Sequence, residues 1–163
     1  MVTLEPMSEL RLRPWFEAGE QDYVADLVQA GKTPDQIRRT IQHSFEDYFP
    51  GGVPAPGHLV FDVLHDGEPV GYVWIGPQSD GDEAHWWLWD LAIDEPHRRH
   101  GFARAALVRA EEAARGRGAR SLGLKVFGFN TGARALYASL GYQTVTLQMT
   151  KPLVPPGLVT TPR

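Results

Sequence analysis

The stretch from residue 89 to residue 103 constrains the fold of this chain more than any other. Its sequence, WDLAIDEPHRRHGFA, is typical of an apolar strand that runs into a tight basic loop, and the loop opens a helix. The loop carries the pattern R-x-x-G-x-A, with Arg98, Gly101 and Ala103 at the defined positions. A loop of this kind presents backbone N–H groups at the positive end of a helix dipole, an arrangement that binds a pyrophosphate.

The side chains of the loop favour an anionic ligand as well. Glycine suits position 101 because a Cβ there would obstruct the approach of phosphates or a positive φ angle. Positive charge gathers around this glycine from Arg98, Arg99, His100 and Arg104. The alternative is an ordinary strand-to-helix turn with a solvated basic face, and the loop by itself leaves both interpretations open.

A second motif follows further along the chain. Residues 121–142 read SLGLKVFGFNTGARALYASLGY, which predicts a short strand, then Asn130, then a helix that carries Leu136 and Tyr137. With both motifs present in this order, the chain resembles the GNAT superfamily of acetyl-CoA-dependent N-acetyltransferases. The resemblance covers residues 58–151 and is vague before them.

The length of the chain suits one domain. A chain of 163 residues can bury a full hydrophobic core. We expect a single GNAT acetyltransferase domain over residues 1–163, in three parts. Residues 1–57 are expected to form a helical segment on the acceptor side, residues 58–151 the cofactor-binding core, and residues 152–163 a loose tail.

Composition excludes several classes of function. The chain has no cysteine, which excludes disulfides, thiolate metal sites and a cysteine acyl-enzyme. A net charge of −4 argues against a nucleic-acid partner. No apolar run approaches the roughly 20 residues of a membrane span, and residues 1–13 lack the apolar centre of a secretory signal. We therefore expect a cytoplasmic protein without a membrane partner, and leave open whether it forms a homodimer.

Hydrophobic periodicity predicts an α/β fold. The resemblance implies the GNAT fold, a mixed and mostly antiparallel sheet with helices on both faces. Two central strands of that sheet, here 84–93 and 122–127, are expected to splay apart and admit the pantetheine arm of the cofactor. The predicted helices cover 15–30, 34–48, 102–115 and 131–140, and the other predicted strands cover 58–65, 69–76 and 142–151. The helix over 102–115 is expected to bury Ala106, Leu107, Ala110 and Ala114. The strand over 69–76 is expected to place Val70, Tyr72 and Trp74 on one face, and residues 78–83 to form a polar turn before the strand over 84–93.

The resemblance implies cofactor contacts residue by residue. Backbone groups of Leu91, Ala92 and Ile93 are expected to pair with the pantetheine and polarise the acetyl carbonyl, while their side chains pack in the core. Asn130 is expected either to contact the cofactor arm or to cap the helix that follows it. The pyrophosphate is expected at the loop and helix start formed by Arg98, Arg99, His100, Gly101, Phe102 and Ala103.

Two residues are candidates for proton transfer. Tyr137 is the candidate general acid, because a phenol with a pKa of about 10 is protonated at neutral pH and suits a thiolate leaving group. Its alternative role is core packing. Asp90 is the candidate general base, although strict alternation places Trp87 and Trp89 on one face and Asp90 on the other. A bulge near Leu91 would re-aim Asp90, and its alternative role is a buried hydrogen-bond acceptor.

The resemblance thus implies an N-acetyltransferase that moves an acetyl group from acetyl-CoA to a primary amine by direct attack in a ternary complex. No metal is expected, because His97 and His100 lack an acidic partner at ligand spacing. The alternatives are a module of the same fold that binds acyl-CoA without turnover, and an O-acetyl or longer-acyl transferase. The tryptophans at 74, 86, 87 and 89 are either a stacking platform for the acceptor or sheet core.

Overall fold

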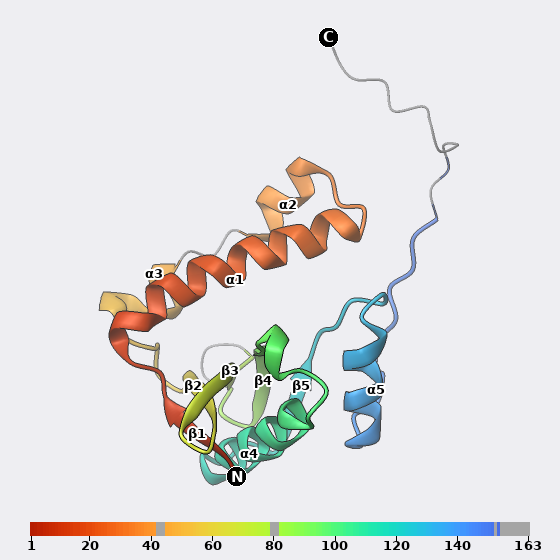
Figure 1. The fold of residues 1–163 in the computed structure, drawn as a ribbon. Coiled ribbons are helices and arrows are strands. Elements are labelled where there is room, and N and C mark those ends of the chain that lie inside the picture. The colour runs from red at the N-terminus through yellow and green to blue at the C-terminus, as the bar shows by residue number, and fades with distance from the viewer. Residues whose placement is uncertain (42–44, 79–81, 152, 154–163) are drawn as a thin grey trace. The chain divides into compact units, whose positions relative to one another are not determined.

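A computed structural model describes residues 1–41, 45–78, 82–151 and 153 of the chain (Figure 1). The chain divides into two compact units, Met1–Phe129 and Asn130–Arg163, and each is described by itself. The predicted tail over 152–163 falls almost wholly outside the described residues, as does part of the polar turn before the strand predicted at 84–93.

A five-stranded sheet forms the centre of the first unit, and its strands follow one another across the sheet in chain order. The first four strands pair antiparallel, whereas the fourth and fifth run parallel, which confirms the mixed sheet that the sequence predicts. Asp66 and Gly67, both with positive φ angles, form the tight turn between the second and third strands. The strands are β1 (Val2–Pro6), β2 (Leu59–His65), β3 (Glu68–Pro77), β4 (His85–Ile93) and β5 (Ser121–Leu124).

Helix α4 (Phe102–Gly116) covers one face of the sheet and packs against β1, β3 and β4. Its buried residues recur at helical spacing, so that one stripe of the helix faces the sheet. These residues, as the sequence predicts, are Ala106, Leu107, Ala110 and Ala114.

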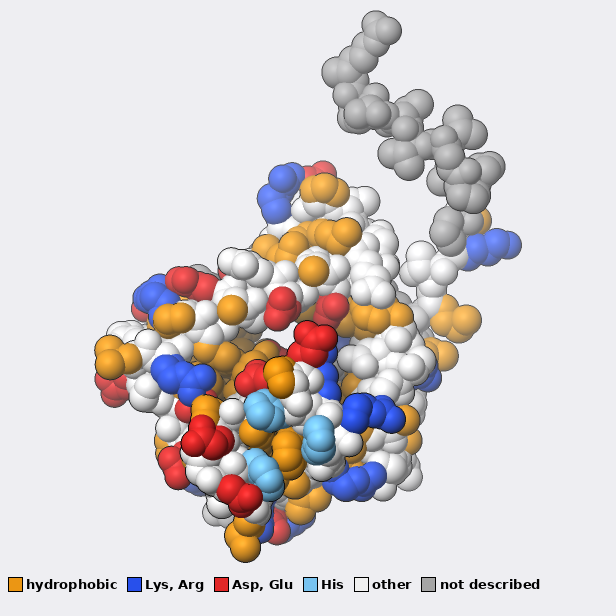
Figure 2. All heavy atoms as spheres, in the orientation of Figure 1, with side chains coloured by type: hydrophobic (Ala, Val, Ile, Leu, Met, Phe, Trp, Pro, Cys, Tyr) orange, Lys and Arg blue, Asp and Glu red, His pale blue; other side chains and the backbone are white. Residues whose placement is uncertain are grey.

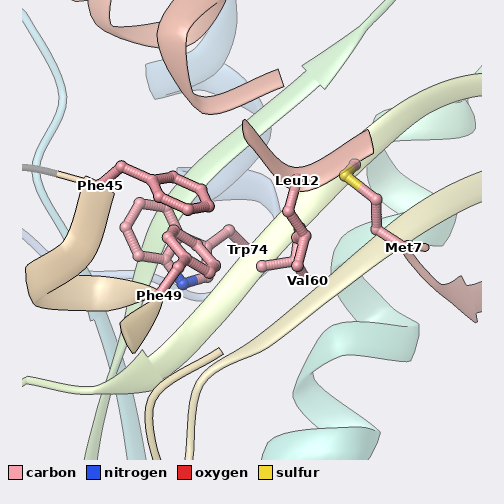
Figure 3. Packing of buried hydrophobic residues seen from close by; sticks show 6 residues of the cluster. All are labelled: Met7, Leu12, Phe45, Phe49, Val60 and Trp74. Carbon is pink, nitrogen blue, oxygen red and sulfur yellow. The ribbon is translucent and has the colours of Figure 1, made fainter. Parts of the chain in front are cut away.

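Helix α1 (Glu9–Gln29) and the short α3 (Phe45–Tyr48) lie on the other face. Their apolar side chains meet the sheet in a cluster of buried residues (Figure 3). Aromatic rings at Trp15, Phe16, Tyr48, Tyr72 and Trp89 pack around the cluster, which makes this face of the sheet unusually rich in rings. The buried members are Met7, Leu12, Phe45, Phe49, Val60 and Trp74.

The first part of the chain differs from the prediction in three ways. It opens with the strand β1, which the sequence did not reveal. Helix α1 begins at Glu9 rather than at residue 15, since the helix extends N-terminally past Pro14, which lies inside it. The helix predicted over 34–48 is α2 (Pro34–Thr40) and α3, and the residues between 41 and 45 lie outside the described part. A capping box at Thr33 begins α2.

The second unit contains helix α5 (Thr131–Ser139). The strand predicted over 142–151 is wrong, since none of these residues is in a strand. Its prediction rested on alternating apolar residues, yet Val145, Leu147 and Met149 are 96%, 71% and 83% exposed. Alternation marks a strand only where a neighbouring strand pairs with it and a packed layer covers its apolar side.

Within the described residues, no helix combines the length and the apolar character that crossing a membrane requires.

Candidate functional site

A bulge divides β4 into two halves. Trp74 of β3 pairs with Asp90 and the next residue, Ile75, pairs with Leu88, so Trp89 is an extra residue in β4. A bulge of this kind bends its strand and interrupts the alternation of side chains. A bulge near Leu91 was one possibility from the sequence, and the structure places it two residues earlier, at Trp89.

The bulge directs two consecutive side chains to the face covered by α1. The Trp89 ring stacks on Trp74, with centroids 5.3 Å apart and an interplanar angle of 23°. The next residue, Asp90, accepts a hydrogen bond from the hydroxyl of Tyr72. Both partners contact Trp15 of α1. The prediction that Trp89 and Asp90 lie on opposite faces is therefore wrong, because alternation does not hold across an extra residue.

The two central strands separate at the same level. β5 pairs with β4 only from His85 to Leu88, and its last pair joins Leu88 to Leu124. Beyond this point β4 continues to Ile93 in register with β3 alone. This confirms the splayed pair that the fold class predicts, although β5 is shorter than the predicted strand. Among the residues that the structure describes, the second half of β4 consequently has one edge without a paired strand.

Asp90 lies at the start of this half-paired segment and both of its carboxylate oxygens are engaged. Oδ2 accepts the Tyr72 hydroxyl at 2.9 Å, and Oδ1 accepts the backbone N–H of Leu91 at 2.8 Å. Burial raises the pKa of Asp90, while these two hydrogen bonds act to lower it and the charges of Asp22 and Asp26 act to raise it. Burial and the neighbouring Asp90 raise the pKa of Tyr72, which keeps its hydroxyl protonated as a donor.

The loop after β4 connects the strand to α4. It contains a short 3-10 turn, η2 (Glu95–His97), and the side chain of Arg98 donates from Nε to the Ile93 carbonyl at 2.9 Å. Arg99 and Gly101 adopt φ angles of 68° and 80°, in the left-handed region. A Cβ built on Gly101 would meet no atom within 4 Å, so the space before this residue is open. The glycine is needed for its φ angle, as the sequence predicted.

The first N–H groups of α4 have no acceptor within the helix. The first i→i−4 hydrogen bond of the helix runs from the Ala105 N–H to the Gly101 carbonyl, at 3.1 Å. The N–H groups of Phe102 and Ala103 precede that bond and have no acceptor within the helix. Together with the helix dipole they make this end attractive to an anion.

Histidines surround the side chain of Phe102. The rings of His65 and His100 lie 4.6 and 5.6 Å from it, and Nδ1 of His100 is 3.2 Å from the His97 carbonyl oxygen. Histidine side chains lie among basic and acidic ones on the face shown in Figure 2. The described residues contain no group of three or more histidine, aspartate or glutamate side chains arranged to hold a metal ion.

In the second unit, Asn130 caps α5. Its side-chain oxygen accepts the Ala133 N–H at 3.1 Å, which is the capping role that the sequence allowed for it. Tyr137 is partly buried, and its ring lies 5.7 Å from that of Tyr142. Helix α5 has no buried residue, so this contact is a local one between neighbouring rings, and both the acid role and the core-packing role of Tyr137 stay predictions.

Several residues of the site were not foreseen from the sequence. Tyr72 was expected on a strand face but not as the partner of Asp90, and that pairing depends on the register between β3 and β4. Of the tryptophans at 74, 86, 87 and 89, Trp74 and Trp86 are buried and belong to the core. Trp74 donates from Nε1 to His58 at 3.0 Å. The indole N–H of Trp89 is buried and has no hydrogen-bond partner among the residues that the structure describes.

Known proteins resemble this chain over nearly its whole length. The Acetyltransferase (GNAT) family matches residues 6–142. The uncharacterized N-acetyltransferase YycN of Bacillus subtilis (strain 168) is 30% identical over 154 residues, which cover 93% of this chain and 99% of that protein. The uncharacterized N-acetyltransferase YdgE of the same organism is 27% identical over 153 residues, covering 93% and 98%.

Solved structures agree with these matches. The crystal structure of YycN has a TM-score of 0.82 against this chain and covers 95% of it and 100% of YycN. AAC(6')-Iy, in complex with the bisubstrate analog CoA-S-monomethyl-acetylneamine, is 13% identical and has a TM-score of 0.58, with coverage of 93% and 97%. The second likeness concerns the fold alone. From the family match over residues 6–142 and from the similarity to YycN, it follows that the chain belongs to the GNAT family of acetyltransferases.

Proposed function

We propose that this chain transfers an acetyl group from acetyl-CoA to a primary amine by direct attack within a ternary complex. The observation that carries the proposal is the join between β4 and α4. In the described part of the chain, a strand with one unpaired edge leads into a basic loop, and a left-handed glycine then begins a helix whose first N–H groups have no acceptor within the helix. The resemblance to the GNAT fold implies that the pantetheine arm lies along such a strand edge, and a helix start of this kind favours a pyrophosphate.

The residues present fit that ligand. The space before Gly101 is open, so a phosphate can approach the start of α4 without meeting a side chain of that residue. The proposed pyrophosphate site is completed by Arg98, Arg99, His100, Phe102 and Ala103. Arg98 also fixes the loop to the end of β4. The backbone of Leu91, Ala92 and Ile93 would hold the pantetheine and acetyl groups, and Asn130 would contact the cofactor arm. The CoA bisubstrate analog bound by AAC(6')-Iy supports the same kind of ligand.

The ligand supplies an activated acetyl thioester, and the chain supplies hydrogen bonds and proton transfers. The N–H of Leu91 donates to the carbonyl oxygen on which negative charge develops during attack. The amine nitrogen forms a bond to the carbonyl carbon and loses a proton, for which Asp90 is the acceptor. The carbon–sulfur bond breaks, and Tyr137 donates a proton to the departing thiolate. With no cysteine in the chain, no acyl-cysteine intermediate forms.

Gly101→Glu tests the proposed cofactor site, because it places bulk and negative charge where the pyrophosphate would lie. Calorimetric affinity for acetyl-CoA should fall at least about tenfold. Gly118→Glu is the matched control, since Gly118 lies just beyond the other end of α4, has a φ angle of 93° and likewise meets no atom within 4 Å. The control introduces the same strain and charge and should bind normally. Equal affinity in the two folded variants would show that the pyrophosphate binds elsewhere.

Tyr137→Phe tests the general acid. It keeps the ring and removes the proton donor, so kcat should fall about 100-fold while thermal stability and acetyl-CoA affinity stay near those of the parent. A thioester whose thiol has a low pKa needs less protonation, and the defect should shrink with it. A defect of the same size with both thioesters would remove Tyr137 from this role.

The kinetic order tests direct attack in a ternary complex. Double-reciprocal plots of the initial rate for acetyl-CoA and the amine should intersect, and parallel lines would contradict the ternary complex.

A further inference from the structure

The backbone N–H that the proposed reaction needs is already occupied. Leu91 donates it to Oδ1 of Asp90 at 2.8 Å, in the segment of β4 that pairs with β3 and no longer with β5. A thioester carbonyl and this carboxylate oxygen therefore compete for one donor. Both are oxygen acceptors of similar size, so either can accept the same N–H group.

The second oxygen of Asp90 has a separate support. Oδ2 accepts the hydroxyl of Tyr72 at 2.9 Å, a bond that does not involve the Leu91 N–H. Helix α1 passes beside this oxygen at a glycine, Gly19, where a Cβ would come within 3.6 Å of it. Oδ1 can thus leave Leu91 while Oδ2 stays held by Tyr72, because the two oxygens accept from different donors.

We propose that the Asp90 carboxylate is an internal stand-in for the acetyl carbonyl oxygen, which it resembles as an acceptor of the Leu91 N–H. In the free chain Oδ1 accepts this N–H. When the thioester binds, its carbonyl oxygen replaces Oδ1, and the released carboxylate oxygen becomes available to accept the proton of the amine. Tyr72 is a positioning residue that retains Oδ2 during the exchange. The inference rests on the proposed function, since it assumes a bound acetyl thioester.

Two ligands separate the carbonyl from the rest of the cofactor. Acetyl-CoA carries the carbonyl, and S-ethyl-CoA is the thioether that lacks it but has the same phosphates and the same charge. The ratio of their dissociation constants reports on the carbonyl alone, and general effects on charge or on cofactor binding cancel in it. If neither ligand binds the parent chain, the proposed function fails, whatever role Asp90 has.

Asp90→Ala removes the competing oxygen. It should tighten acetyl-CoA relative to S-ethyl-CoA by about 5- to 10-fold, the factor expected from one hydrogen bond freed of competition. The same variant should lose kcat, because the proton acceptor is gone. Asp90→Asn retains an oxygen that accepts the Leu91 N–H and loses the basicity, so its ratio should stay within about twofold of the parent while kcat falls. An unchanged ratio in folded Asp90→Ala would overturn the inference.

Asp22→Asn is the matched control, because Asp22 acts on Asp90 through its charge and is not its hydrogen-bond partner. Its ratio should equal that of the parent. A ratio that rises as much as in Asp90→Ala would show that charge rather than competition is responsible, and would also overturn the inference.

A measurement on the unsubstituted chain avoids any question of folding. The amide resonance of Leu91 should move when acetyl-CoA is added and move much less with S-ethyl-CoA, since only the carbonyl replaces Oδ1. Equal movement with both ligands at saturation would contradict the exchange.

Tyr72→Phe should lower kcat with little change in the ratio of the two dissociation constants, because Tyr72 holds the other oxygen of Asp90.

Discussion

The two faces of β4 differ in kind although they belong to one strand. On the face toward α4, small and aliphatic side chains of that helix are fully buried, and Ala106, Leu107 and Ala110 have no exposed surface. On the face toward α1, rings pack against Trp89, whose indole N–H has no partner in the described part of the chain, and a carboxylate is tied to Tyr72. The first face holds the sheet to its helix, whereas the second carries a carboxylate and a phenol, which are groups that can accept or donate a proton.

The difference shows how one strand serves two purposes. Apolar side chains packed without gaps stabilise a fold but cannot donate or accept protons. Rings and a hydrogen-bonded carboxylate bury area as well, and they keep polar atoms in reach of a ligand. Substitutions on the first face should therefore change stability more than chemistry, and substitutions on the second should change both.

The largest effect is expected from Leu107→Ala on the face toward α4. Removing a fully buried side chain there should lower the free energy of unfolding by about 2–5 kcal/mol, because a cavity forms that the neighbouring alanines cannot fill. Chemical denaturation measures the loss. A change below about 1 kcal/mol would mean that this face is not the tightly packed one.

Trp74→Phe probes the opposite face and should cost less stability and more activity. It removes part of a buried ring and the hydrogen bond to His58, which together contribute about 2 kcal/mol. Because Trp74 also stacks on Trp89 beside Asp90, kcat per folded molecule should fall as well. Normal turnover in a destabilised Trp74→Phe chain would show that both faces are only structural.

A smaller effect is expected in the pH dependence of the free energy of unfolding, to which Asp90 on the face toward α1 contributes. Burial raises the pKa of Asp90, so the folded chain binds more protons than the unfolded chain between the two pKa values. The contribution of Asp90 to the free energy of unfolding is therefore largest at acidic pH and is lost as pH rises through its folded pKa.

Asp90→Asn removes this titration, and its stability relative to the parent should increase as pH is raised from about 4 toward neutrality. Denaturation curves of the two chains over that range measure the trend. A relative stability of Asp90→Asn that decreases with rising pH would mean that the pKa of Asp90 is lowered instead.

The smallest effect is expected on the solvent side of α4. Arg109 donates to Glu112 at 3.1 Å, and both side chains are about half exposed. Exposed pairs of this spacing contribute about 0.5 kcal/mol or less, so Arg109→Ala should hardly move the unfolding transition. A large shift would locate part of the stability of α4 outside its buried stripe.

Sequence reasoning was most successful where one periodicity holds throughout an element. The buried stripe of α4 follows the 3.6-residue repeat, and its members were predicted without error. The basic loop was also located correctly, because glycine at position 101 serves a φ angle that other residues rarely adopt.

Other features depend on partners that a sequence does not specify. The place of the bulge follows from the register of β4 against β3, and the Tyr72–Asp90 bond follows from the bulge. Strand β1 is short and lies at the edge of the sheet, with few buried side chains to mark it. For residues 142–151 the opposite error arose, since a regular alternation was present without a paired strand.

The extra residue in β4 has a consequence for how the site can change over generations. A bulge depends on how many residues one strand places opposite its partner and not on which side chains they carry. Substituting Trp89 therefore alters the ring but leaves the extra residue in β4 in place. Deleting one codon there would instead restore an unbroken ladder against β3. Point mutation can therefore vary the surroundings of Asp90 widely while the bend in the strand persists, and only an insertion or a deletion removes it.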